Sequence, residues 1–258
     1  MKTRKNLCWM IFGMGLILSV LTNNVWGEQQ AEAGKNGLFD GLWEWYYPDG
    51  RVSIKKTYKN GKQEGPYESY HKNGKLKSKG FYKDDKLEGP AETYYESGQL
   101  ESKGTFINEQ KYGLWEDYFE NGKLKSKSYY KNGKLDGPME TYYETGQTES
   151  KKAFANEQKD GVWEDYFATG QLKYRRTYKD GQLGGPYEGY HDNRQLEFKG
   201  RYLNGQKDGP EETYYRNGQL RSKGSYRNGQ NDGLWEYYSE NGRHKKKVTF
   251  KDGKIGGR

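Results

Sequence analysis

Cysteine, proline and apolar residues are all scarce in this chain of 258 residues. It contains one cysteine, Cys8, and six prolines, and only 31% of its residues are hydrophobic, against roughly 45–50% in an average soluble domain. A single cysteine excludes an internal disulfide framework. The shortage of apolar residues argues against a thick two-layer core, so any fold must be thin and must depend on packing and hydrogen bonds.

Low hydrophobicity combined with 31% charged residues is typical of disorder. The aromatic content argues against disorder, because the chain has 25 Tyr, 9 Phe and 7 Trp, together with 36 Gly. This combination favours many short, twisted strands joined by tight turns. The 44 basic and 36 acidic residues are interleaved and not blocked, so we expect no nucleic-acid partner.

The segment 1–27 differs from the rest of the chain. A basic start (Lys2, Arg4, Lys5) precedes an apolar run from Leu7 to Leu21, and small or tolerated residues lead up to Gly27. This layout is typical of a secretory signal peptide, and an apolar run of this length is short for a bilayer core of roughly 30 Å. We therefore expect cleavage near Gly27 and export to the periplasm, the cell surface or the medium, with a mature chain that lacks cysteine.

A 24-residue repeat organises the remainder of the chain. Each unit begins with a glycine, which we number position 0. Position 3 is always Glu, position 5 always Tyr and position 17 always aromatic, while position 9 is Gly except at Arg194 and position 14 is Lys except at Arg175. The position 0 glycines are Gly41, Gly65, Gly89, Gly113, Gly137, Gly161, Gly185, Gly209 and Gly233. Such a fixed period predicts an array of repeated units.

The array also contains a longer similarity. The segments that start at Phe106 and Phe154 match at eleven of fourteen positions, and they lie two repeat lengths apart. This match indicates duplication of a block of two repeats.

Each unit predicts a β-hairpin. A short aromatic strand such as 43–47 is followed by a turn such as Asn73-Gly74, then by a longer strand such as 123–130, and then by a second turn such as Asn132-Gly133. Asn-Gly favours a two-residue type I′ turn, and no unit has the apolar period of a helix. We predict an all-β fold, an elongated single antiparallel sheet of nine hairpins over 41–258, after an irregular lead-in at 28–40.

The hairpin register pairs the invariant charges. If positions 8 and 9 form a two-residue loop, the numbers of facing positions sum to seventeen, and Glu at position 3 lies opposite Lys at position 14. An exposed cross-strand pair contributes about 0.2–1 kcal/mol, and a bulge at the turn would shift this register. The predicted pairs include Glu68 with Lys79, Glu116 with Lys127 and Glu212 with Lys223.

The same register divides the side chains between two faces. One face carries Glu, Lys, a mostly charged position 12 and the invariant tyrosines, such as Tyr118, Tyr142 and Tyr166. The other carries position 2, Leu at position 11 and the aromatic residue at position 17. The candidate binding aromatics at position 2 are Trp43, Tyr67, Trp115, Trp163, Tyr187 and Trp235. An uncovered apolar strip usually marks an interaction surface.

The unit Gly-x-Trp-Glu-x-Tyr-Tyr-x-x-Gly-x-Leu-x-x-Lys-x-x-Tyr-x-x-Gly, as at 113–133, resembles the bacterial variant of the MORN repeat. The resemblance runs from about Gly41 to Gly257. It implies an elongated sheet that acts as a scaffold or binding surface without catalytic residues. MORN repeats are linked to membranes and protein assembly, and many bacterial relatives are labelled toxin–antitoxin antitoxins of the YwqK type. An exported chain fits that label only as an immunity protein against an exported toxin.

Reactive chemistry is not indicated. His71, His191 and His244 occupy repeat positions that are Tyr, Phe or Leu elsewhere, and adjacent acids such as Glu116 and Asp117 are periodic, whereas an active site needs one special environment. The mature chain has no cysteine for a thiol-based zinc site, and its Asp-Gly pairs lack the acidic run of a calcium loop. We expect no enzyme activity, no metal and no cofactor.

Three kinds of partner stay open. We favour an exported scaffold that binds another protein through the aromatic face, with the polar face as the alternative surface. The rivals are a cell-wall glycan that stacks on the aromatic rings and an anionic membrane attracted by the weakly basic chain. The oligomeric state is not determined by these patterns.

Overall fold

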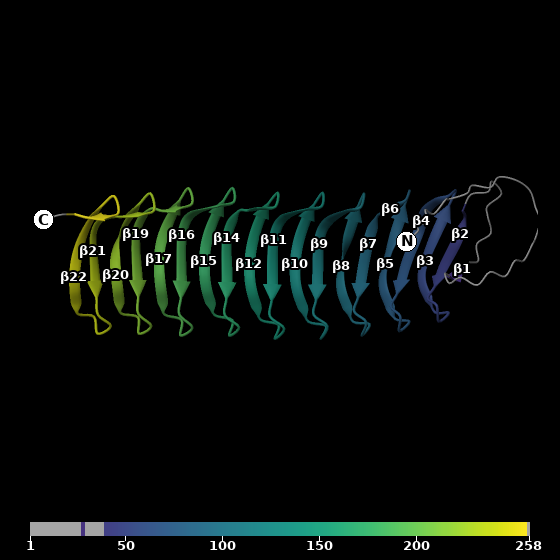
Figure 1. The fold of residues 1–258 in the computed structure, drawn as a ribbon, viewed down its shortest axis with the longest axis horizontal. Coiled ribbons are helices and arrows are strands. Elements are labelled where there is room, and N and C mark those ends of the chain that lie inside the picture. The colour runs from purple at the N-terminus through teal and green to yellow at the C-terminus, as the bar shows by residue number, and fades with distance from the viewer. Residues whose placement is uncertain (1–26, 29–38, 257–258) are drawn as a thin grey trace, which may run out of the picture.

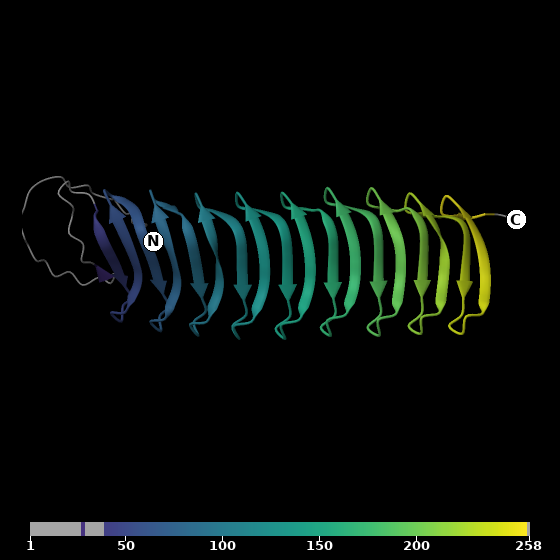
Figure 2. The ribbon, with the colours of Figure 1, turned by 180° about the vertical axis from the view of Figure 1, so that it is seen from behind.

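The computed structural model describes residues 27–28 and 39–256. The predicted signal peptide, except Gly27, and most of the predicted lead-in lie outside these residues. The described part is one antiparallel sheet of 23 strands, without a helix. The hairpins lie side by side in chain order (Figure 1), and the view from behind shows the same order (Figure 2). The prediction of an all-β, single-sheet hairpin array is confirmed.

The strands fall into three groups. The first strands of the repeats are β2 (Gly41–Tyr46), β4 (Lys62–Tyr70), β7 (Gly89–Tyr94), β9 (Gln110–Tyr118), β11 (Lys134–Tyr142), β14 (Gly161–Tyr166), β16 (Gln182–Tyr190), β19 (Gly209–Tyr214) and β21 (Gln230–Tyr238). The second strands are β3 (Val52–Lys59), β5 (Leu76–Lys83), β8 (Leu100–Ile107), β10 (Leu124–Lys131), β12 (Thr148–Ala155), β15 (Leu172–Lys179), β17 (Leu196–Leu203), β20 (Leu220–Arg227) and β22 (His244–Lys251). The short strands are β1 (Gly27–Glu28), β6 (Lys86–Leu87), β13 (Gln158–Lys159), β18 (Gln206–Lys207) and β23 (Lys254–Ile255).

The first turn of each hairpin differs from the prediction. In the turn after β4, the His71 amide donates to the Lys75 carbonyl (2.8 Å) and the Gly74 amide donates to the His71 carbonyl (2.9 Å). Gly74 has φ of 82°, so this is a three-residue loop with a left-handed glycine. The Asn73 carboxamide oxygen accepts the Lys75 amide (2.9 Å), which stabilises the loop. The predicted two-residue type I′ turn is wrong at this end of the sheet.

Type I′ turns occur instead at the opposite end, between repeats. Asn132 and Gly133 have φ of 51° and 76°, and they join the paired residues Lys131 and Lys134. Positive φ at both central residues is what type I′ requires.

A bulge restores the predicted register. The three-residue loop leaves Tyr70 opposite Leu76, one residue out of the expected pairing, and a shift before Ser78 brings Glu68 opposite Lys79. The extra residue on the second strand is position 12. The predicted pairs of Glu116 with Lys127 and Glu212 with Lys223 are found as well.

The bulge moves two positions to the opposite face. Leu at position 11 now faces Tyr at position 5, as the contact of the Tyr238 and His244 rings at 5.5 Å shows for one repeat. Position 12 joins the aromatic face, where Lys173 Nζ lies 5.3 Å from the Tyr174 ring. The predicted faces of both positions were therefore wrong. The leucines concerned are Leu76, Leu100, Leu124, Leu172, Leu196 and Leu220.

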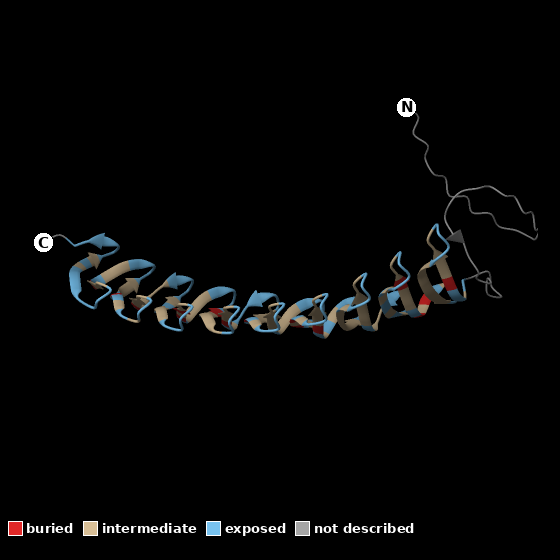
Figure 3. Cartoon of the chain, turned by 90° about the horizontal axis from the view of Figure 1, so that it is seen from below, coloured by how far each residue is buried: buried red, intermediate tan, exposed pale blue. Residues whose placement is uncertain are grey.

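The array bends into a shallow arc when seen from below (Figure 3). Its buried apolar residues are aromatic rings: Trp43, Trp115, Trp163, Tyr178, Tyr187 and Trp235. These rings belong to the side of the sheet that carries positions 2 and 17, which we call the ring face. The opposite side carries positions 3, 5 and 14, and we call it the polar face.

Candidate binding surfaces

A ladder of alternating charges runs along the polar face. In the first eight repeats, the basic residue at position 14 is paired in register with the Glu of its own hairpin and with the Glu of the next one, as Lys79 is with Glu68 and Glu92. The Lys79 ammonium forms its ion pair with the next repeat, at 2.8 Å from Glu92, whereas Lys55 forms its pair with Glu44 of its own hairpin (3.0 Å). Lys223, like Lys79, reaches the next repeat, at Glu236 (2.7 Å), so the ladder links repeats as well as the strands within them.

The invariant tyrosines complete this ladder. The Tyr118 hydroxyl donates to Glu116 (3.1 Å), Tyr166 donates to Glu164 (2.5 Å), and Tyr142 donates to Glu140. Each tyrosine is half-buried, and burial together with the adjacent carboxylate raises the pKa of Tyr142 and Tyr166 to about 12. These tyrosines therefore orient the glutamates and help to hold the hairpins together.

The pKa values of the ladder glutamates are shifted in the opposite direction, which is downwards. The hydrogen bond from Lys103 is the main cause that lowers the pKa of Glu116, with a further contribution from Tyr118. Bonds from Lys223 and Lys247 lower the pKa of Glu236 to about 2. The ladder thus favours ionised glutamate and protonated tyrosine in the folded state.

We expect the melting temperature to be highest between about pH 5 and pH 9. Because the glutamate pKa values are depressed, their stabilisation is present above about pH 4.3 and is lost as the pH falls towards about 2. Because the tyrosine pKa values are raised, their stabilisation is present below about pH 10 and is lost as the pH rises towards about 12. Thermal melts followed by circular dichroism across this range test the expectation. In the Glu116→Gln variant, the melting temperature should fall less in acid than it does in the unaltered protein. A melting temperature that does not change between pH 6 and pH 2.5 would contradict the expected role of the glutamates.

The position 2 rings form the core of the ring face. Trp43, Trp115, Trp163, Tyr187 and Trp235 are between 4% and 9% exposed, and Tyr67 is half-buried. Their faces are covered by their neighbours, so five of the six candidate binding aromatics offer no open platform to a flat ligand.

Neighbouring repeats supply that cover. The Trp115 ring contacts the Phe106 ring at 5.0 Å and the Tyr130 ring at 6.4 Å, and Lys111 Nζ lies 4.1 Å from its centre. Trp115 Nε1 donates to the Thr105 carbonyl (3.3 Å). The Trp115 indole is therefore held between two repeats by ring contacts, a cation and a hydrogen bond.

Glycines beneath two of the indoles make this packing possible. A Cβ added to Gly104 would lie 2.2 Å from the Trp115 ring, and one added to Gly224 would lie 2.1 Å from the Trp235 ring. A glycine within a strand often marks such a close approach. Both glycines hold position 15 of their repeats, and we call a glycine at this position a ring platform.

Three repeats lack a ring at position 2, where they carry Ala91, Met139 and Glu211. Ala91 replaces the ring in the third repeat, and a pocket of about 350 Å³ lies there. In the eighth repeat, Glu211 accepts the Tyr187 hydroxyl and pairs with Lys207 at 2.8 Å. Burial and this carboxylate raise the pKa of Tyr187. The sequence analysis did not single out Ala91 or Glu211, although the break in the position 2 pattern was the available signal.

The polar face carries a second feature that the sequence analysis missed. Positions 1 and 16 lie beside the charge ladder, because residues two apart in a strand share a face, and they pair across the strands, as Leu114 does with Tyr129. In several repeats they are large, apolar and 39–51% exposed. We define the apolar row as Leu42, Phe81, Leu114, Tyr129, Val162 and Leu234. Exposed apolar residues gathered in this way typically mark an interaction surface.

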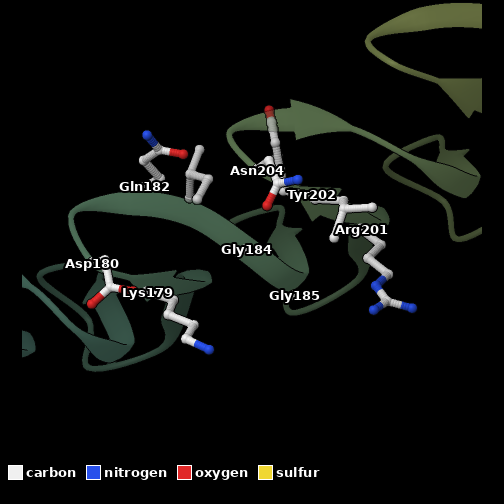
Figure 4. A pocket seen from close by; sticks show the side chains of 10 residues that line it. Lys179, Asp180, Gln182, Gly184, Gly185, Arg201, Tyr202 and Asn204 are labelled. Atoms are coloured by element: carbon white, nitrogen blue, oxygen red, sulfur yellow. The ribbon is translucent and has the colours of Figure 1, made fainter.

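Another hollow lies near the type I′ turns before and after the seventh hairpin. It is lined by Lys179, Asp180 and Gln182 from one hairpin and by Arg201 and Asn204 from the next. Figure 4 shows the Gln182 and Arg201 side chains extending in different directions. Its polar groups do not converge on one point, so we assign no ligand to it.

The histidines act as structural members of the array. His71 Nε2 lies 2.8 Å from the Tyr94 carbonyl, and His191 Nε2 lies 3.2 Å from the Tyr214 carbonyl. Tyr47 makes the same contact to the Tyr70 carbonyl. Within the described residues, no group of three or more His, Cys, Asp or Glu side chains is placed to hold a metal ion, and no helix is long and apolar enough to cross a membrane.

A family model described as "MORN repeat variant" matches eight segments of this chain. They are residues 39–60, 63–84, 87–108, 111–132, 135–156, 159–180, 207–228 and 231–252. The unmatched interval contains Arg194, which takes the place of the position 9 glycine with φ of 73°. Strands β16 and β17 nevertheless form the same hairpin there.

No curated protein matches the chain. The solved structures that resemble it include two with the titles "Crystal Structure of TcdB2-TccC3-Cdc42" and "Crystal Structure of TcdB2-TccC3". They are 13% and 15% identical to it, cover 80% and 83% of it, and give a TM-score of 0.22 in both cases. The chain spans 13% of the length of each, and similarity at this level carries no argument about function.

Proposed function

We propose that this chain, which belongs to the MORN repeat variant family, is a non-catalytic exported scaffold that binds another protein along the apolar row of its sheet. The observation that carries the proposal is the exposure of that row. Leu42, Val162 and Leu234 are 49–51% exposed on the face that also carries the charge ladder. Water-exposed apolar side chains in a line gain free energy when a partner covers them.

The surroundings of the row suit a protein partner. Two strands per repeat, each about 4.8 Å wide, place equivalent positions about 10 Å apart. Leu114 and Val162, two repeats apart, are therefore separated by about 20 Å along the array. The charge ladder lies on the same face, and a polar margin around an apolar centre is the usual arrangement of a protein interface. Tyr129 adds an amphipathic ring of the kind that interfaces favour.

Burial of the position 2 rings weighs against a glycan as the main partner. A sugar that stacks on Trp115 or Trp163 would need an open ring face, and these rings are 5% and 8% exposed. The row itself is apolar and offers few hydrogen-bond donors. A cell-wall glycan and an anionic membrane therefore remain as outcomes to be distinguished by experiment.

The proposal is tested by capture from an envelope extract of the source organism, using the purified protein and a variant with Leu114, Val162 and Leu234 each replaced by Lys. We expect the protein to retain one specific polypeptide, identified by mass spectrometry. The variant should capture at least about tenfold less of that polypeptide. A tenfold loss corresponds to about 1.4 kcal/mol of binding free energy, and three buried apolar contacts are worth more than that. If the captured polypeptide is a toxin, the scaffold acts as an immunity protein.

A matched control carries the same change in charge at the other end of the hairpins. Gln99, Gln147 and Gln219 are exposed at position 10, where Lys75 and Lys123 stand in other repeats. Replacing these three glutamines by Lys should leave capture unchanged. Equal capture by the row variant, or retention of glycan or lipid alone, would contradict the proposal.

A further inference from the structure

The gap at Ala91 has the dimensions of a ligand site. Its volume of about 350 Å³ lies within the range of about 300–1,000 Å³ that small-molecule sites occupy. Its walls include Tyr67 and Tyr82 from one side and Phe106 and Trp115 from the other. The pocket is therefore an aromatic slot on the ring face, on the opposite side of the sheet from the apolar row.

A ring platform lies in this slot without an indole over it. Gly80 holds position 15 of the preceding repeat, as Gly104 does beneath Trp115. A Cβ added to Gly80 would meet only the Leu87 methyl group at 3.0 Å, the Ala91 Cβ at 3.7 Å and the Pro90 oxygen at 3.9 Å. Here a Leu87 methyl group lies over the surface on which an indole lies elsewhere, and the chain supplies no ring of its own.

The hydrogen-bond acceptor of the other repeats is present too. Trp163 Nε1 donates to the Ala153 carbonyl (2.9 Å), which also accepts the Asp160 amide (3.1 Å). The equivalent carbonyl beside the slot is that of Phe81, which accepts the Glu88 amide (2.8 Å). A carbonyl oxygen has two lone pairs, so the Phe81 carbonyl can accept a ring N–H in the same way.

One cation lies on the wall of the slot. Lys111 belongs to the lining, and its ammonium lies over the Trp115 ring that forms one side. The corresponding residue one repeat earlier is Leu87, which keeps the other side apolar. A ligand with an anionic group at one edge would match this distribution of charge.

We infer that the Ala91 slot binds a small indole carboxylate. The ring displaces the flexible end of Leu87 and lies over Gly80 between Tyr82 and Phe106. Its N–H donates to the Phe81 carbonyl, and its carboxylate faces Lys111. This binding is independent of the protein partner proposed above, because it uses the opposite face of the sheet.

Titration with indole-3-acetate, followed calorimetrically and by NMR chemical shifts, tests the inference. We expect saturable binding with a dissociation constant of about 1 mM or below. Indole and 1-naphthaleneacetate, which lack the carboxylate and the N–H respectively, should bind about tenfold more weakly. Lys111→Met should abolish the preference for indole-3-acetate over indole. Failure of indole-3-acetate to bind at about 5 mM would overturn the inference.

The slot itself is tested by filling it. Ala91→Trp, or the smaller Ala91→Phe, should lower affinity at least about tenfold, while circular dichroism shows the same sheet. Met139→Trp, at the same position two repeats later, should bind as the unaltered protein does. Unchanged affinity in both Ala91 variants, or an equal loss in Met139→Trp, would place the ligand elsewhere and overturn the assignment.

Discussion

Replacing Trp115 with alanine is expected to lower the free energy of unfolding by about 3–5 kcal/mol, the usual cost of removing a buried tryptophan. The Trp115 ring is 5% exposed and packs against Phe106 and Tyr130, which belong to two different repeats. Its loss also leaves the Thr105 carbonyl without its indole donor. Because each repeat contacts only its neighbours, the loss of stability should be concentrated at the interface between the third and fourth repeats.

Urea unfolding followed by far-ultraviolet circular dichroism measures this effect. The adjacent Leu114, 39% exposed on the polar face, is the matched control, and Leu114→Ala should change stability by about 0.5 kcal/mol or less. Equal effects of the two substitutions would show that the ring face is not the core. Hydrogen exchange should show the largest loss of protection in β8 and β9.

The second large effect is expected at the ring platforms. Gly104→Ala places a methyl group where the Trp115 ring now lies, 2.2 Å from its nearest atom. The indole must leave its position, so we expect destabilisation of about 3 kcal/mol, at the upper end of what overpacking costs. The same urea titration measures it.

Gly80→Ala makes the same chemical change at the equivalent position of the neighbouring repeat. The added methyl group meets only the flexible end of Leu87 at 3.0 Å, with no ring above it. Because alanine restricts the unfolded chain more than glycine does, we expect a change between zero and about 1 kcal/mol of stabilisation. A loss at Gly80 as large as that at Gly104 would contradict the assignment of the indole as the cause.

The repeat period made the array and its pairing predictable. Glu68 and Lys79 face each other because nine copies of one register leave little freedom, and the hairpin length follows from the two turns. The turn types were not predictable from Asn-Gly alone. Asn73 is held by its own side chain in a loop where only Gly74 has positive φ, whereas Asn132 itself takes positive φ.

The faces and the site were less predictable, since both depend on contacts between repeats. The bulge at position 12, which moves Leu76 to the polar face, compensates for a loop length that the sequence leaves open. The cover over Trp115 comes from Tyr130 of its own hairpin and from Phe106 and Gly104 of the preceding one. Strand-interior glycines such as Gly104 were the missed signal for this packing, and Ala91 was the missed signal for the slot.

The charge ladder has a consequence for how such a chain changes its copy number. Every unit brings one carboxylate and one cation to the polar face, and each cation also serves the following unit. Inserting or deleting whole units therefore leaves this line electrically neutral and regenerates the same contact at the junction. We infer that the similarity between the segments at Phe106 and Phe154 reflects one such event, which would lengthen the molecule without altering the chemistry by which its units meet.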